Sequence, residues 1–157
     1  MAKEIELKFT VDVTLLALEN GTRITQGYLP TTGKAAVRIR ITDQSAFLTI
    51  KGENKGATRT EFEYPIPRVD ARQLIEELCD RPLIEKIRYL VGVNGNTWEV
   101  DVFEGDNQGL IIAEIELDSE DQRVEIPPWA VKEVTGDPRY YNSNLIRHPY
   151  RDWKNTE

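Results

Sequence analysis

The stretch Met1-Ala-Lys-Glu-Ile-Glu-Leu-Lys-Phe9 alternates charged and apolar side chains residue by residue. Successive side chains of a β-strand point to opposite faces, so Glu4, Glu6 and Lys8 share one face and the apolar residues between them share the other. The pattern therefore predicts a strand that carries two possible metal-ligating carboxylates and a cation on one side. Most of the later strand-like segments repeat this arrangement.

Seven further segments have strand character and are separated by turn residues. They are Thr22–Leu29, Ala35–Thr42, Ala46–Lys51, Thr58–Ile66, Leu83–Val93, Thr97–Phe103 and Leu110–Leu117. Asn94-Gly95-Asn96 joins two of them and is a strong hairpin signal. Eight strands with few edge-blocking features predict a closed eight-stranded antiparallel β-barrel in a mainly β (α+β) protein.

Helical segments are few and are expected to flank the barrel. The clearest has Ala71, Leu74 and Ile75 at helical spacing and ends before Pro82. The complete set of predicted helices is Asp12–Asn20, Val69–Asp80, Pro127–Val134 and Pro138–Arg147.

Composition narrows the class of protein. The 157 residues fit a single domain over 1–157, although the hydrophobic fraction of 39% is low and the charged fraction of 30% is high. A net charge of -7, without a Lys/Arg-rich run, disfavours nucleic acid and anionic membranes as partners. Cys79 is the single cysteine, which excludes an intramolecular disulfide, and no apolar signal or membrane-spanning stretch is present. We therefore expect a cytoplasmic protein.

Strand parity assigns the charged side chains to one face of the predicted sheet. The acidic members are Glu4, Glu6, Glu61, Glu63, Glu99, Asp101, Glu114 and Glu116, and the basic members are Lys8, Arg38, Arg40, Lys51, Arg59, Lys86 and Arg88. Such a face is usually solvated in an antiparallel sheet. Like charges two residues apart gain little in water, however, and they favour the alternative that this face lines the barrel and binds ligands.

A closed barrel with this interior suits an extended, multiply charged anion. Lysine and arginine side chains would bind the anion, while carboxylates would hold divalent cations that bridge to it. Oxygen-only ligands favour Mg²⁺ or Mn²⁺ over zinc or copper.

The ordered set of charged motifs resembles the CYTH superfamily, also called triphosphate tunnel metalloenzymes. The similar segments are Glu4-Ile-Glu-Leu-Lys8, Val37-Arg-Ile-Arg40, Thr49-Ile-Lys51, Arg59-Thr-Glu-Phe-Glu63, Glu85-Lys-Ile-Arg88 and Ala113-Glu-Ile-Glu-Leu117. The stretch Val134–Leu145 is similar to the short bacterial, inorganic triphosphatase-like branch of the family. The resemblance implies an eight-stranded barrel that acts as a tunnel, in which triphosphates are hydrolysed or cyclised with a divalent metal.

The resemblance also implies roles for individual residues. It implies metal coordination by Glu4, Glu6 and Glu116, with Glu63, Asp101 and Glu114 as candidates for a second metal or its water shell. It implies phosphate contacts from Lys8, Arg38, Arg40, Lys51, Lys86 and Arg88. Within this set, Lys86 is the preferred cation beside the scissile phosphate, and Glu63 or Glu114 is the expected acceptor of the proton of the attacking water.

The leading expectation is a metal-dependent inorganic triphosphatase that converts tripolyphosphate to pyrophosphate and phosphate. The chain is short and offers few aromatic residues to stack a base. The alternatives are a class IV adenylate cyclase, a thiamine triphosphatase, and a sensor that binds polyphosphate or nucleotide without chemistry. Apolar outer strand faces need covering, by helices or by a second copy, so a homodimer is also expected.

Overall fold

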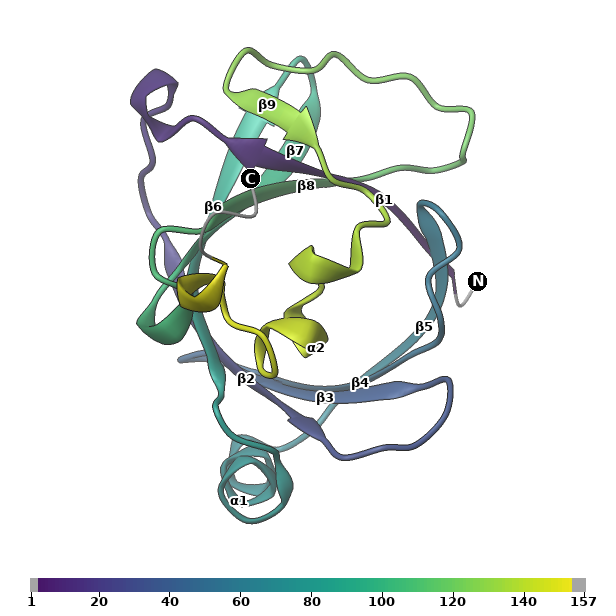
Figure 1. Ribbon diagram of the computed structural model, residues 1–157, viewed down its shortest axis with the longest axis vertical. Helices are drawn as coiled ribbons and strands as arrows, with labels where there is room; N and C mark the ends of the chain where they lie inside the picture. The colour runs from purple at the N-terminus through teal and green to yellow at the C-terminus, as the bar shows by residue number, and fades with distance from the viewer. Residues whose placement is uncertain (1–2, 154–157) are drawn as a thin grey trace.

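The computed structural model describes residues 3–153 and contains the predicted barrel. The strands around the barrel are β1 (Lys3–Val11), β2 (Thr22–Leu29), β3 (Ala36–Ile41), β4 (Ala46–Lys51), β5 (Thr58–Pro65), β6 (Ile84–Val93), β7 (Asn96–Phe103) and β8 (Ile111–Glu116). They pair in the order β5-β4-β3-β2-β6-β7-β8-β1, and an additional pairing between β1 and β5 closes the ring. All these pairings are antiparallel, which confirms the predicted eight-stranded antiparallel β-barrel (Figure 1).

β1 completes the barrel because it has partners along both of its edges. Its early residues pair with β5, with Glu4 opposite Arg59, while the following residues pair with β8, with Glu6 opposite Glu116. The last residues of β1 also pair with β9 (Ala130–Glu133), which lies outside the ring of eight. The stretch that begins the chain is therefore the strand at which the sheet closes.

The interior of the barrel is divided into a charged part and an apolar part. Ile84, Phe103 and Ile112 have the same strand parity as the charged residues, but they pack with Tyr140 and Leu145 from the C-terminal segment. We call residues 138–153 the C-terminal plug. It comprises η3 (Pro138–Tyr140), α2 (Asn142–Leu145) and η4 (Tyr150–Asp152), and Figure 1 shows α2 within the ring of strands. The plug fills one part of the lumen and leaves the other part polar.

Two apolar clusters cover much of the outside of the barrel. The helix α1 (Arg68–Leu78) buries Ala71 and Ile75 against Ile39 of β3. On the opposite side, Trp98 is fully buried between Phe9 and Trp129, with ring centroids 5.7 and 5.5 Å away. The outer face of β4 and β5 carries Ile50, Phe62 and Tyr64, which remain exposed. The expected homodimer stays a prediction.

The structure corrects most of the helix predictions. Of the segment 12–20 only η1 (Val13–Leu15) is helical, a single 3₁₀ turn that Asp12 caps. The helix predicted for 127–134 is wrong, because residues 130–133 form β9, which pairs with β1. The predicted helix 138–147 is divided between η3 and α2, and a further turn, η2 (Gly105–Asn107), was not predicted. Only the prediction for 69–80 is confirmed, as α1. No helix among residues 3–153 combines the length and apolar character that crossing a bilayer requires.

Gly27 allows the end of α1 to pack closely on β2. A methyl group at this position would lie 2.9 Å from Cys79 Cβ, Cys79 Sγ and Leu83 Cδ2. We expect Gly27→Ala to lower the free energy of unfolding by about 1–3 kcal/mol, measured by urea denaturation, because the core must shift to admit the methyl group. Gly92→Ala is the control, since a methyl group there meets no described atom within 4 Å. Equal midpoints for the two variants would contradict the close packing.

Candidate functional site

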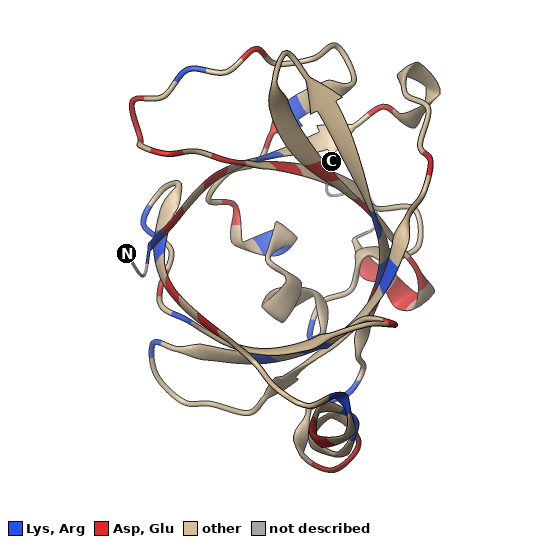
Figure 2. Cartoon of the chain, turned by 180° about the vertical axis from the view of Figure 1, so that it is seen from behind, with Lys and Arg blue, Asp and Glu red and all other residues tan. Residues whose placement is uncertain are grey.

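The polar part of the barrel interior is a cavity of about 180 Å³, which we call the tunnel. Strand parity brings the predicted charges to its wall, and every predicted site residue except Asp101 lines it. Figure 2 shows acidic and basic residues distributed around the strands of the ring. The alternative of a solvated charged face is therefore excluded for these strands.

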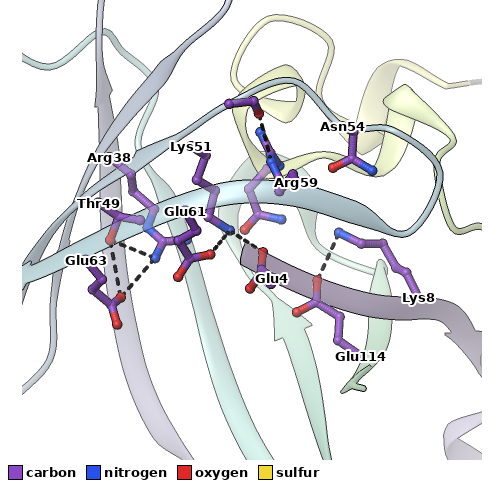
Figure 3. A network of polar contacts seen from close by, with 12 residues as sticks. Glu4, Lys8, Arg38, Thr49, Lys51, Asn54, Arg59, Glu61, Glu63 and Glu114 are labelled. Atoms are coloured by element: carbon purple, nitrogen blue, oxygen red, sulfur yellow. Dashed lines mark hydrogen bonds and ion pairs between the residues drawn. The ribbon is translucent and has the colours of Figure 1, made fainter. Parts of the chain in front are cut away.

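One side of the tunnel wall holds cations with too few partners. Arg38 is 5% exposed, and its Nη2 donates to Thr49 Oγ1 at 3.1 Å and to Glu63 Oε2 at 3.5 Å (Figure 3). Its Nε is buried and has no hydrogen-bond acceptor among the described residues. Burial, together with Arg38 and Arg88, lowers the pKa of Arg40 to about 10. An anion in the tunnel would supply the missing negative charge and acceptors.

Carboxylates crowd a second side of the wall, around β1. Burial raises the pKa of Glu4 to about 7, against the opposing attraction of Lys51 at 3.4 Å. Burial, with Glu114 and Glu4 nearby, raises the pKa of Glu6 to about 8. Figure 3 shows Lys51 between Glu4 and Glu61, with Lys8 directed at Glu114. Burial and the neighbouring carboxylates therefore make the ionised forms of Glu4 and Glu6 unfavourable in the empty tunnel.

Lys8 and Glu114 form a close pair on neighbouring strands. Their residues lie opposite each other on β1 and β8, and Lys8 Nζ is 2.9 Å from Glu114 Oε2. Burial opposes ionisation of Glu114, but Lys8 and Arg88 outweigh it and lower the pKa of Glu114 to about 2. A carboxyl group of such low pKa is a poor proton acceptor.

Asp101 lies behind the wall and binds two of the predicted cations. Its Oδ2 accepts from Lys86 Nζ at 2.8 Å, and its two oxygens receive a bidentate pair from Arg88 at 2.7 and 2.9 Å. Lys86 and Asp101 are both 2% exposed. Burial lowers the pKa of Lys86 to about 7. The charge of Asp101 opposes this shift, whereas the charges of Arg88 and Arg40 add to it. The contacts of Asp101 differ from those expected of a metal ligand, because both of its oxygens already bind cations.

Three carboxylates of the tunnel wall form a donor set suited to a divalent cation. Glu4, Glu6 and Glu116 supply only carboxylate oxygens, which hard cations such as Mg²⁺ prefer. Burial, with neighbouring carboxylates, raises the pKa values of Glu4 and Glu6, and a bound cation would favour their ionised forms. Among residues 3–153, however, no three Asp, Glu, His or Cys side chains are gathered as a metal cluster. The three carboxylates nevertheless match the ion in ligand type and in charge.

The plug contributes a part of the tunnel wall that sequence parity did not identify. Tyr141, Asn142 and Ser143 line the tunnel, and the Tyr141 ring lies 5.9 Å from Lys8 Nζ and 5.8 Å from Arg59 Cζ. These three residues are not on strands, so the alternation of the barrel carries no information about them. The only available signal was their position in the segment that resembles the family's short branch.

Gln26 is a second member of the polar network that the pattern of charged residues does not reveal. It is fully buried on β2 and links Arg40 to Asn142. Its Oε1 accepts a hydrogen bond from Arg40 Nε at 2.9 Å, and its Nε2 donates to Asn142 Oδ1 at 3.0 Å. The sequence does carry one signal for Gln26, which is a polar residue on the same strand face as the apolar Ile24 and the aromatic Tyr28.

Comparison with known proteins gives a consistent result. The CYTH domain model matches residues 2–150. An inorganic triphosphatase from Acetivibrio thermocellus is 46% identical over 155 residues, which cover 98% of this chain and 99% of that protein. An inorganic triphosphatase from Nitrosomonas europaea is 36% identical over 146 residues, covering 90% and 95% of the two chains.

Solved structures agree with the sequence relatives. The crystal structure of an inorganic triphosphatase superposes with a TM-score of 0.66 at 35% identity and covers 90% of this chain and 96% of that one. A putative adenylate cyclase from Bacillus halodurans has a TM-score of 0.61 at 16% identity, covers 76% and 84% of the two chains, and shares the fold alone.

Proposed function

Because the chain belongs to the CYTH domain family, we propose that it is a metal-dependent inorganic triphosphatase that hydrolyses tripolyphosphate to pyrophosphate and phosphate. The observation that carries the proposal is the tunnel itself. It is a small polar cavity in which arginines without enough neighbouring negative charge face a group of closely spaced carboxylates. Tyr28 and Tyr141 are the only aromatic residues among those described on its wall. Such a cavity suits a phosphate chain better than a nucleobase.

The cations of the wall would bind and orient the substrate. Lys8, Lys51 and Arg38 come from three different strands, so they would contact phosphate oxygens from several directions and hold the chain along the tunnel. The remaining members of the proposed phosphate-binding set are Arg40, Lys86 and Arg88. Asp101 fixes the positions of Lys86 and Arg88, which supports Lys86 as the cation beside the scissile phosphate.

Glu4, Glu6 and Glu116 would hold the cation, for which we propose Mg²⁺ or Mn²⁺. When bound, such an ion neutralises phosphate charge and lowers the pKa of a water ligand. Of the two expected proton acceptors, Glu114 is the weaker candidate, because its cationic neighbours lower its pKa to about 2. We therefore propose Glu63 for this role. Glu63 lines the tunnel with a side chain that is 40% exposed, so a proton passes readily from it to solvent.

An organic triphosphate is the second candidate substrate. A groove of about 700 Å³ adjoins the tunnel and shares Tyr28, Arg59 and Tyr141 with it. We call this the outer groove. A nucleoside or thiamine substituent could lie in the outer groove while its triphosphate occupied the tunnel.

The substrate is tested by incubating the purified protein with tripolyphosphate, ATP or thiamine triphosphate, each with Mg²⁺, Mn²⁺ or EDTA. We expect phosphate and pyrophosphate from tripolyphosphate at the highest rate, and no product in EDTA. Cyclic AMP from ATP would identify a cyclase instead. Binding of tripolyphosphate without turnover under any condition would identify a sensor.

A further inference from the structure

Asn142 connects the plug to the cationic wall of the tunnel. Its Oδ1 accepts a hydrogen bond from Lys86 Nζ at 2.8 Å and a second from Gln26 Nε2 at 3.0 Å. Lys86 is 2% exposed and Gln26 is fully buried, so both donors approach from the protein interior. Asn142 itself lines the tunnel.

The hydrogen-bond donors around Asn142 determine the orientation of its amide. The Lys86 ammonium can only donate. Gln26 must turn its Oε1 toward Arg40, whose Nε donates to it at 2.9 Å, and it therefore presents its Nε2 to Asn142. Two donors on the same side require Oδ1 there, so the Asn142 Nδ2 amino group points the other way. No described residue accepts a hydrogen bond from this Nδ2.

A neutral donor at this position is well suited to a phosphate oxygen. Arg40, Lys86 and Arg88 already place three basic side chains on this side of the tunnel, with Asp101 as the counter-charge of two of them, and a further cation would add repulsion. An amide N–H adds a hydrogen bond to a charged acceptor without adding charge.

We propose that Asn142 is a substrate-binding residue, which holds Lys86 through Oδ1 and donates from Nδ2 to an oxygen of the bound triphosphate. This inference rests on the proposed function and deepens it, because it assigns part of the phosphate site to the plug and not to the barrel.

The plug is anchored firmly enough for this role. Leu145 and Ile146, which follow Asn142 closely, are 0% and 7% exposed in the apolar part of the lumen. Asn144 Nδ2 donates to the Pro138 carbonyl at 2.8 Å and ties α2 to η3. The Asn142 amide is thereby held in place before substrate arrives, which lowers the entropic cost of binding.

Asn142→Asp separates the two functions of the side chain. One carboxylate oxygen still accepts from Lys86 and Gln26, but the other replaces the N–H donor and repels phosphate. We expect KM for tripolyphosphate to rise by about 10- to 100-fold, with a matching loss of affinity in calorimetric titrations with tripolyphosphate in EDTA. The melting temperature without substrate should not fall. Asn142→Ala should also weaken binding, by about tenfold, without introducing a charge.

Asn20→Asp is the control, because it makes the same amide-to-carboxylate change at an exposed residue that does not line the tunnel. Its KM should stay within about twofold of the wild type. Equal effects of the two aspartates would overturn the proposal, as would an Asn142→Asp variant with unchanged KM and affinity.

If the wild type binds tripolyphosphate without hydrolysing it, the proposed function fails and the titrations alone decide the role of Asn142. If the wild type neither binds nor hydrolyses it, both proposals are overturned.

Discussion

Replacing Glu4 or Glu6 with glutamine is expected to reduce metal-dependent hydrolysis of tripolyphosphate by on the order of 10³-fold, because each variant removes a proposed ligand of the ion. Glutamine has the shape of glutamate but lacks the charge that binds a hard cation. Both glutamates line the tunnel on β1, where burial and neighbouring carboxylates raise their pKa values to about 7 and about 8. The measurements are phosphate release with Mg²⁺ or Mn²⁺ and metal binding by calorimetry.

The same two variants are expected to fold at least as stably as the wild type in EDTA. Removing one buried carboxylate relieves repulsion among the others, so function and metal-free stability change in opposite directions. Glu85→Gln is the control, since Glu85 is an exposed strand glutamate that points away from the tunnel. If Glu4→Gln and Glu6→Gln retained full activity, the metal assignment would be wrong. A large loss of stability would instead give these glutamates a structural role.

The second prediction concerns Asp101, which binds Lys86 and Arg88 in the interior. Asp101→Asn leaves two buried cations without their shared counter-charge, a change that typically costs about 3–5 kcal/mol. For a chain of this length, each kcal/mol corresponds to about 2–4 °C, so we expect the melting temperature to fall by roughly 6–20 °C. Thermal and urea unfolding in EDTA measure the loss.

Tripolyphosphate distinguishes the two possible roles of Asp101. If Asp101 is the counter-charge of Lys86 and Arg88, tripolyphosphate in EDTA should raise the melting temperature of Asp101→Asn more than that of the wild type, because the anion replaces the lost charge. A variant of normal stability with weakened metal affinity would restore Asp101 as a metal ligand. Asp106→Asn is the control, since Asp106 pairs with Arg151 at the surface, where an ion pair contributes about 0–1 kcal/mol.

Strand parity predicted most of the barrel and most of the tunnel wall correctly. Each strand obeys a strict two-residue alternation, so the charged faces of β1, β3 and β8 could be assigned before their partners were known. The short elements were predicted less well. Ala130–Glu133 became a strand because β1 offers it a free edge, a condition that no local pattern in 127–134 expresses.

Alternation along the chain is enough to assign residues to a face, and with it to predict the charged lumen, the resemblance to triphosphate-binding barrels and the set of candidate ligands. How those charges pair emerges only in the folded barrel. It placed Asp101 behind Lys86 and Arg88, and it brought Asn142 from the C-terminal plug into the wall. Alternation along a strand is a local property of the backbone, whereas pairing across a barrel depends on register and on which segment fills the lumen.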